Sequence, residues 1–147
     1  MDPPFEEGRL LMDLVGTWRL DSAYFVAQKT GDRIDILGAN PFGFFILDPS
    51  GRMITIMTSD SHTRENATGD IAELYRSMIS YTGRVSIDGE KAVTHVDGAW
   101  DPGWVGTEQV RYASLNGNML SLRSAPLRHP AFPDDEVVGY VNWEKEA

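Results

Sequence analysis

The chain of 147 residues contains no cysteine, no cluster of Lys or Arg, and no apolar run longer than residues 42–47. The lack of cysteine excludes disulfides, thiolate metal sites and cysteine nucleophiles, and it fits a reducing compartment. The apolar run falls far short of the ~20 residues that a membrane-spanning helix needs. The first residues are acidic and rich in proline, unlike a signal peptide. We therefore expect a cytoplasmic protein without a membrane span.

The chain also lacks the features of a nucleic-acid or membrane binder and the standard motifs of enzymes that use a cofactor, a metal or a nucleophilic serine. Its 13 basic and 22 acidic residues give a net charge of −9, which makes nucleic acid and anionic membranes poor partners. Neither a phosphate loop, a dinucleotide fingerprint nor a Gly-x-Ser-x-Gly elbow is present. The histidines at 62, 95 and 129 lie far apart, without metal-ligand spacing. We expect no metal and no cofactor.

What the sequence does contain is alternation of apolar and polar residues, interrupted by turn residues. This pattern predicts antiparallel strands in one domain covering residues 1–147. The expected strands are 16–28, 44–47, 52–58, 79–87, 92–99, 105–115, 119–124 and 137–145. Asp48-Pro49-Ser50-Gly51 and Asn116-Gly117 are strong hairpin turns between them.

One segment has helical rather than alternating spacing. Apolar residues in 70–79 fall at i, i+3, i+4, i+7 and i+8, which predicts an amphipathic helix with Asp70 and Glu73 as a capping box. We expect its apolar face to pack on the sheet or across one end of it. Eight sequential strands and one helix predict an up-and-down β-barrel, with a β-sandwich as the alternative.

The Gly16-Thr17-Trp18 motif near the start predicts how the barrel closes. It follows a short amphipathic turn and begins the first strand, so Gly16 would allow a sharp turn and Trp18 would fill the closed end. Strict alternation would then place Tyr24 on the same inward face as Trp18.

Several segments, taken in order, resemble the small bacterial and fungal lipocalin-like domain family. They are residues 14–20 (LVGTWRL), 37–43 (LGANPFG), 47–53 (LDPSGRM), 81–83 (YTG), 93–96 (VTHV) and 104–111 (WVGTEQVR). The resemblance covers about residues 12–145 and implies a cup-shaped barrel for a small hydrophobic or amphipathic ligand. Related barrels in secondary-metabolite pathways act as cofactor-free cyclases or isomerases. A homodimer is compatible with the sequence, which does not decide the oligomeric state.

Three residues are candidates for catalysis. His95 has the near-neutral pKa of a general acid or base, if it faces the cavity; the alternative is a histidine hydrogen-bonded in the wall. Arg111 could bind a carboxylate or stabilise an oxyanion. Tyr81 could orient or protonate a carbonyl oxygen; the alternative, and the commoner outcome for such a residue, is a buried structural tyrosine. The sequence leaves open which strand faces point inward.

Five further residues are candidates for ligand binding: Tyr24, Met57, Trp104, Gln109 and Trp143. Gln109 shares a strand face with Arg111, Met57 offers an adaptable apolar wall, and the aromatic rings could line the cavity or its rim. In lipocalin-type barrels a basic side chain also packs over the Gly-x-Trp indole. Arg111, Arg123 and Lys145 are three alternatives for that role.

These observations lead to two hypotheses about function. The first is a cofactor-free enzyme, of the cyclase or isomerase type, that acts on a small, mostly apolar metabolite inside the barrel. The second is a non-catalytic intracellular carrier for a similar ligand. An enzyme needs polar groups that converge inside the cup, whereas a carrier needs only an apolar cavity.

Overall fold

The computed structural model describes residues 7–146. Its strands are β1 (Gly16–Ala27), β2 (Arg33–Asp35), β3 (Phe42–Leu47), β4 (Arg52–Thr58), β5 (Met78–Asp88), β6 (Lys91–Ala99), β7 (Glu108–Asn116), β8 (Met119–Arg123), β9 (Leu127–Arg128) and β10 (Glu136–Lys145). The helices are α1 (Glu7–Leu14) and α2 (Ile71–Arg76), with short 3-10 turns η1 (Arg64–Asn66) and η2 (Pro102–Trp104).

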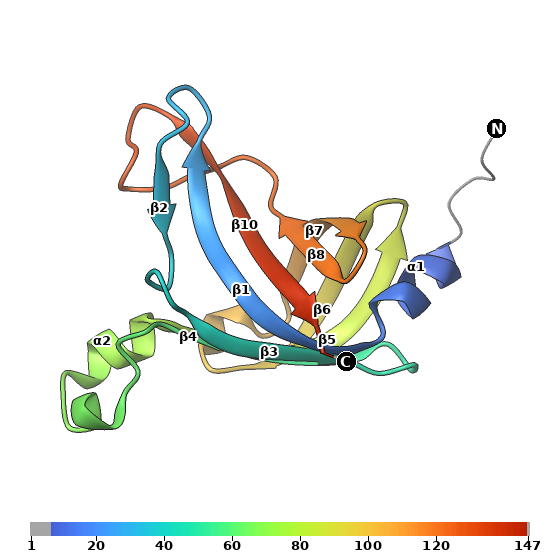
Figure 1. Cartoon of the computed structure of the whole chain (residues 1–147), viewed down its shortest axis with the longest axis horizontal. Coiled ribbons are helices and arrows are strands. Elements are labelled where there is room, and N and C mark those ends of the chain that lie inside the picture. The colour runs from blue at the N-terminus through green and yellow to red at the C-terminus, as the bar shows by residue number, and fades with distance from the viewer. Residues whose placement is uncertain (1–6, 147) are drawn as a thin grey trace.

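Eight of the strands form a closed antiparallel barrel, as predicted. Neighbouring strands follow the order β1-β3-β4-β5-β6-β7-β8-β10, and pairing of β1 with β10 closes the barrel. Two short strands that the sequence did not predict, β2 and β9, extend the sheet beside β1 and β10. Figure 1 shows the long β1–β10 ribbon rising above the rest of the barrel, with β2 beside β1. The lipocalin-like fold expected from the sequence is therefore confirmed.

The turn residues close the hairpins for identifiable reasons. The Asp48 carboxylate accepts hydrogen bonds from the Ser50 hydroxyl and from the backbone N–H groups of Ser50 and Arg52. The bond from Ser50 is the main cause that lowers the pKa of Asp48 below its ordinary 3.8. At the start of β1, Gly16 has φ of +140°, a conformation that other residues rarely adopt. The sharp turn predicted there is present.

A β-bulge in β1 overturns the strict alternation predicted for that strand. Leu20 pairs with Trp143 and Ser22 pairs with Asn142, so one residue of β1 has no counterpart in β10. A bulge of this kind reverses which side chains face inward beyond it. The prediction that Tyr24 shares the inward face of Trp18 is therefore wrong.

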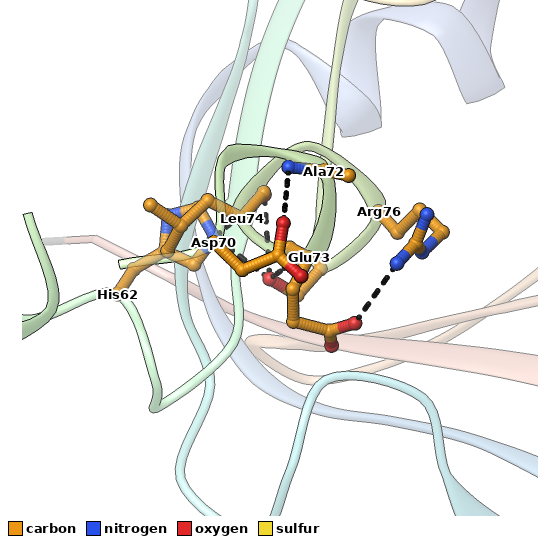
Figure 2. A network of polar contacts seen from close by, with 7 residues as sticks. His62, Asp70, Ala72, Glu73, Leu74 and Arg76 are labelled. Atoms are coloured by element: carbon orange, nitrogen blue, oxygen red, sulfur yellow. Dashed lines mark hydrogen bonds and ion pairs between the residues drawn. The ribbon is translucent and has the colours of Figure 1, made fainter. Parts of the chain in front are cut away.

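The two helices lie at opposite ends of the barrel (Figure 1). The α1 helix packs beside β5 at the end where β1 begins. The α2 helix begins at Asp70, whose carboxylate accepts a hydrogen bond from the Ala72 N–H at 3.0 Å (Figure 2). It ends before Met78, because that residue already pairs with Thr58 in the sheet. Ile71 is 80% exposed, so the expected packing of the apolar face onto the barrel is wrong for this residue.

Candidate functional site

The Gly-x-Trp motif closes one end of the barrel. Trp18 is completely buried, stacks on Phe45 with 5.8 Å between ring centroids, and donates from Nε1 to the Leu14 carbonyl at 3.0 Å. Of the three predicted alternatives, Lys145 covers the indole, with its ammonium 5.6 Å from the ring centroid. Arg123 instead lies over the Tyr112 ring. These contacts assign Trp18 and Lys145 to the architecture of the closed end.

Above this plug lies a cavity of about 60 Å³. Its walls are mostly apolar and come from α1 and from seven of the barrel strands, β3 to β8 and β10. Met53 and Met57 form part of the apolar wall. The polar side chains in the lining are Thr55, Tyr81, Thr94, Arg111 and Trp143. The lumen thus combines an apolar body with polar groups that come from five different strands.

Arg111 is the only charged residue among those that line this cavity. Its guanidinium donates to the Val110 carbonyl at 2.8 Å and to the Gln109 side-chain oxygen at 3.2 Å. Both acceptors are neutral, so the positive charge is held in place without being neutralised. Gln109 does not line the cavity itself but orients the group that does, which explains its place two residues before Arg111 on the same strand face.

Tyr81 enters the same cavity from β5. Burial raises the pKa of its hydroxyl above the ordinary 10.0, and the nearby positive charge of Arg111 offsets only part of that rise. The hydroxyl therefore stays protonated at neutral pH and can act as a hydrogen-bond donor. Its ring lies 5.3 Å from the Trp104 ring, centroid to centroid.

Trp143 supplies a second unused donor. The residue is 2% exposed, and its ring meets Phe45 edge-on at a centroid distance of 4.8 Å. Its Nε1 is buried and has no hydrogen-bond partner among the described residues. A buried N–H without an acceptor costs about 1–3 kcal/mol. The Trp143 N–H is therefore a buried donor for which residues 7–146 supply no acceptor.

Aromatic side chains connect the cavity to the rim. From Tyr81, the contacts run through Trp104 to Trp100 at 5.0 Å and on to Tyr75 of α2 at 6.2 Å, as ring-centroid distances. The Trp100 indole N–H also donates to the Tyr75 carbonyl at 3.1 Å. Trp104 thus lies at the rim and contacts Tyr81 of the cavity wall. Of the two positions predicted for the aromatic rings, the cavity and its rim, it takes the second.

The α2 helix is fixed at this rim by polar contacts. Figure 2 shows His62 beside the helix, where its Nε2 lies 3.0 Å from the Leu74 carbonyl and donates to it. Glu73 and Arg76 form an exposed ion pair at 3.5 Å on the helix surface. Glu73 is thus paired with Arg76, and its predicted capping partner Asp70 binds the Ala72 N–H alone.

His95 lies outside the barrel rather than in the cavity. Its side chain is 52% exposed, 3.3 Å from the Glu108 carboxylate and 3.3 Å from the Ser86 hydroxyl. The neighbouring Thr94 lines the cavity in its place. Successive residues of a strand face opposite sides, so His95 faces outward where Thr94 faces inward. The prediction that His95 acts as an acid or base inside the cup is therefore wrong.

Tyr24 also lies outside the lumen, because of the bulge in β1. It stacks on Tyr140 at 5.3 Å, and the Arg33 guanidinium carbon lies 3.8 Å from its ring centroid. The prediction that Tyr24 touches a ligand in the cavity is therefore wrong, because its ring lies on the outside of the barrel. Met57 and Trp143 do line the cavity, and their part in ligand binding remains a prediction.

The sequence did not single out Thr55 and Thr94 as residues of the site. Thr55 pairs with Tyr81 across β4 and β5, and its hydroxyl donates to the Phe44 carbonyl at 3.0 Å. Thr94 pairs with Gln109 across β6 and β7. The signal was available only as register. Thr55 is the cross-strand neighbour of Tyr81, and Thr94 is that of Gln109, which shares the strand face of Arg111, so both threonines face inward once Tyr81 and Arg111 do.

Neither a metal site nor a membrane-spanning helix is found in the described part of the chain. Residues 7–146 contain no group of three or more His, Asp or Glu side chains placed to hold a metal ion. No helix within the same range is long and apolar enough to cross a membrane.

The fold and the lined lumen define an antiparallel barrel of the calycin type. The family model of the lipocalin-like domain matches residues 15–146, and the chain belongs to this family. No curated protein matches the chain. The barrel and its cavity are compatible with binding of a small ligand.

Proposed function

We propose that this protein binds a small, mostly apolar molecule inside the barrel, with the polar end of the ligand against Tyr81 and Arg111. The observation that carries the proposal is the composition of one cavity. Its wall is apolar except for a few groups, and two of these are a protonated phenol and a cation held by neutral acceptors. Apolar walls with a few placed polar groups are typical of ligand pockets.

The size of the cavity restricts the ligand. A volume of about 60 Å³ is small beside the roughly 300–1,000 Å³ of pockets for drug-sized molecules. A compact ligand fits this space directly, and a longer one requires side chains to move. Met53 and Met57 are unbranched and can repack more easily than the aromatic residues around them.

A cofactor-free isomerase or cyclase is the second candidate function, favoured by the state of Tyr81. A protonated phenol and a guanidinium on one side of a cavity can donate to a carbonyl oxygen and stabilise the negative charge that develops during enolisation or ring closure. His95 has no part in this mechanism, since it lies on the outer surface. The setting in secondary metabolism is a proposal supported by the likeness to related barrels.

Filling the cavity tests the proposed site. Ala92 lines the cavity, so Ala92→Leu adds three carbon atoms to it, whereas Ala72→Leu makes the same change on the exposed surface of α2. We expect 1-pentanol to bind the native chain and Ala72→Leu, with binding lost in Ala92→Leu, as measured by saturation-transfer NMR. Equal binding to all three proteins would place the ligand elsewhere.

Exchange of an α-proton separates catalysis from carriage. In D2O, the native chain should accelerate exchange of 2-pentanone above the buffer rate if it stabilises the enolate; the proton leaves to solvent and deuterium returns from solvent. Tyr81→Phe should then slow the exchange while pentanol binding is retained. Pentanol binding without accelerated exchange would favour the carrier.

A further inference from the structure

The cavity contains more hydrogen-bond donors than acceptors. Arg111 has five N–H donors, and the described contacts use two of them. The Trp143 Nε1–H is buried without a partner, and the Tyr81 hydroxyl remains protonated. A ligand that completes this site must therefore supply acceptors rather than donors.

The charge of the site is also unbalanced. The chain has 22 acidic residues, yet none of those that line the cavity is acidic. The ion pairs found among the described residues instead join side chains that are at least one-third exposed, and none of them involves Arg111. A cation in a low-dielectric cavity is stabilised most by a negative charge that it contacts directly.

We propose that the ligand carries a carboxylate, which binds to the Arg111 guanidinium inside the barrel. This inference rests on the proposed function and names the class of ligand: a short apolar monocarboxylate. A carboxylate matches the planar guanidinium with two parallel hydrogen bonds and leaves acceptor capacity for another donor such as the Trp143 N–H or the Tyr81 hydroxyl. The single negative charge of a monocarboxylate neutralises the single positive charge of the cavity lining, that of Arg111.

The size and charge of the protein narrow this class further. The cavity of about 60 Å³ has no room for a long chain in its present arrangement, so the acid must be short or compact. The net charge of −9 disfavours anions in general. Selection for the carboxylate therefore depends on contact with Arg111 rather than on the overall field of the protein.

Three ligands of the same length test the inference on the native chain: pentanoate, pentanamide and 1-pentanol. By calorimetry at pH 7, we expect pentanoate to bind about 10- to 100-fold more tightly than pentanamide, the range typical for a hydrogen bond to a charged group. Equal affinities of acid and amide would overturn the carboxylate inference but leave the proposed function intact. Failure of all three ligands to bind would overturn both.

Two variants locate the charge that is responsible. Arg111→Gln should reduce the preference for pentanoate over pentanamide to less than about threefold. Arg123→Gln is the matched control, because it removes the same charge from the outer wall, where Arg123 covers Tyr112; it should keep the full preference. Retained preference in Arg111→Gln, with circular dichroism like that of the native chain, would contradict the assignment.

An NMR spectrum of the native chain reports on the carboxylate directly, and a variant is needed only to assign one signal. The four tryptophans give four indole N–H signals, and Trp143→Phe identifies the one from the cavity. Pentanoate should shift this signal downfield by forming the missing hydrogen bond, whereas 1-pentanol should shift it less. An unchanged Trp143 signal at saturating pentanoate would place the carboxylate away from these donors.

Discussion

Replacing Arg111 by methionine separates a ligand-binding residue from a structural one. A structural arginine stabilises the free protein, so its removal is costly. A ligand-binding residue can instead destabilise the unliganded protein, because its favourable interaction forms only when the ligand binds. We expect Arg111→Met to leave the free energy of unfolding of the unliganded chain unchanged or to raise it.

The expected size follows from the contacts of the guanidinium. Its two hydrogen bonds to neutral acceptors contribute about 1.5–3 kcal/mol each, as bonds from a charged donor. The residue is partly buried, so holding its charge partly out of water costs up to several kcal/mol, which offsets these bonds. A buried methionine side chain adds roughly 1.5–3 kcal/mol when fully buried and less when half-buried. The balance lies between no change and a gain of about 2 kcal/mol.

Urea unfolding followed by tryptophan fluorescence measures this difference. Arg123→Met serves as the control for loss of the same charge on the outer wall, and we expect it to change stability by less than about 1 kcal/mol. A loss of more than about 2 kcal/mol in Arg111→Met at unchanged m-value would refute the reasoning, because it would show that Arg111 stabilises the barrel itself.

Three further predictions address the plug, the phenol and the outer histidine. Trp18→Leu should lower the free energy of unfolding by about 3–4 kcal/mol in urea, since it empties a fully buried site and leaves the Leu14 carbonyl without its donor; a loss below 1 kcal/mol would contradict the plug. Because burial raises the pKa of Tyr81, its absorbance at 295 nm should titrate above the ordinary tyrosine pKa of 10.0. Its contribution to stability should be complete below pH 10 and fall as the pH rises through the folded pKa. A difference titration between the native chain and Tyr81→Phe that falls at the ordinary pKa of 10.0 would argue against burial. His95→Ala should change pentanoate affinity less than twofold, because His95 faces solvent beside Glu108; a larger loss would return it to the site.

The barrel was predictable because its signals are local. The turn at residues 48–51 and the alternation of the flanking strands specify a hairpin without any knowledge of the rest of the chain. The Gly-x-Trp motif likewise specified the closed end, where Trp18 is fully buried. The short strands β2 and β9 were not predictable, because they exist only where the long β1–β10 ribbon offers free edges.

Which side chains point into the barrel was less predictable than the strands themselves. In β6, for example, both faces contain apolar side chains. Val93 lies on the outer face, directly before Thr94, which is 8% exposed and lines the cavity. The usual pattern of apolar residues inside and polar residues outside is thus reversed at this point, and only the register with β7 shows it. His95 was misplaced for this reason, and Tyr24 because a bulge depends on pairing with a distant strand.

The bulge in β1 has a consequence for the size of the ligand. Beyond it, β1 presents the small Ala23 to the interior instead of Tyr24, and Ala23 is 3% exposed. Leu37, from the loop before β3, joins the same buried cluster and is 2% exposed. The Leu37 carbonyl accepts a hydrogen bond from the Asp60 N–H at 3.3 Å, which ties this loop to the end of β4. Ala23 and Leu37 thus belong to the packed core, and neither lines the cavity that contains Arg111, so this part of the interior offers no additional room for a ligand.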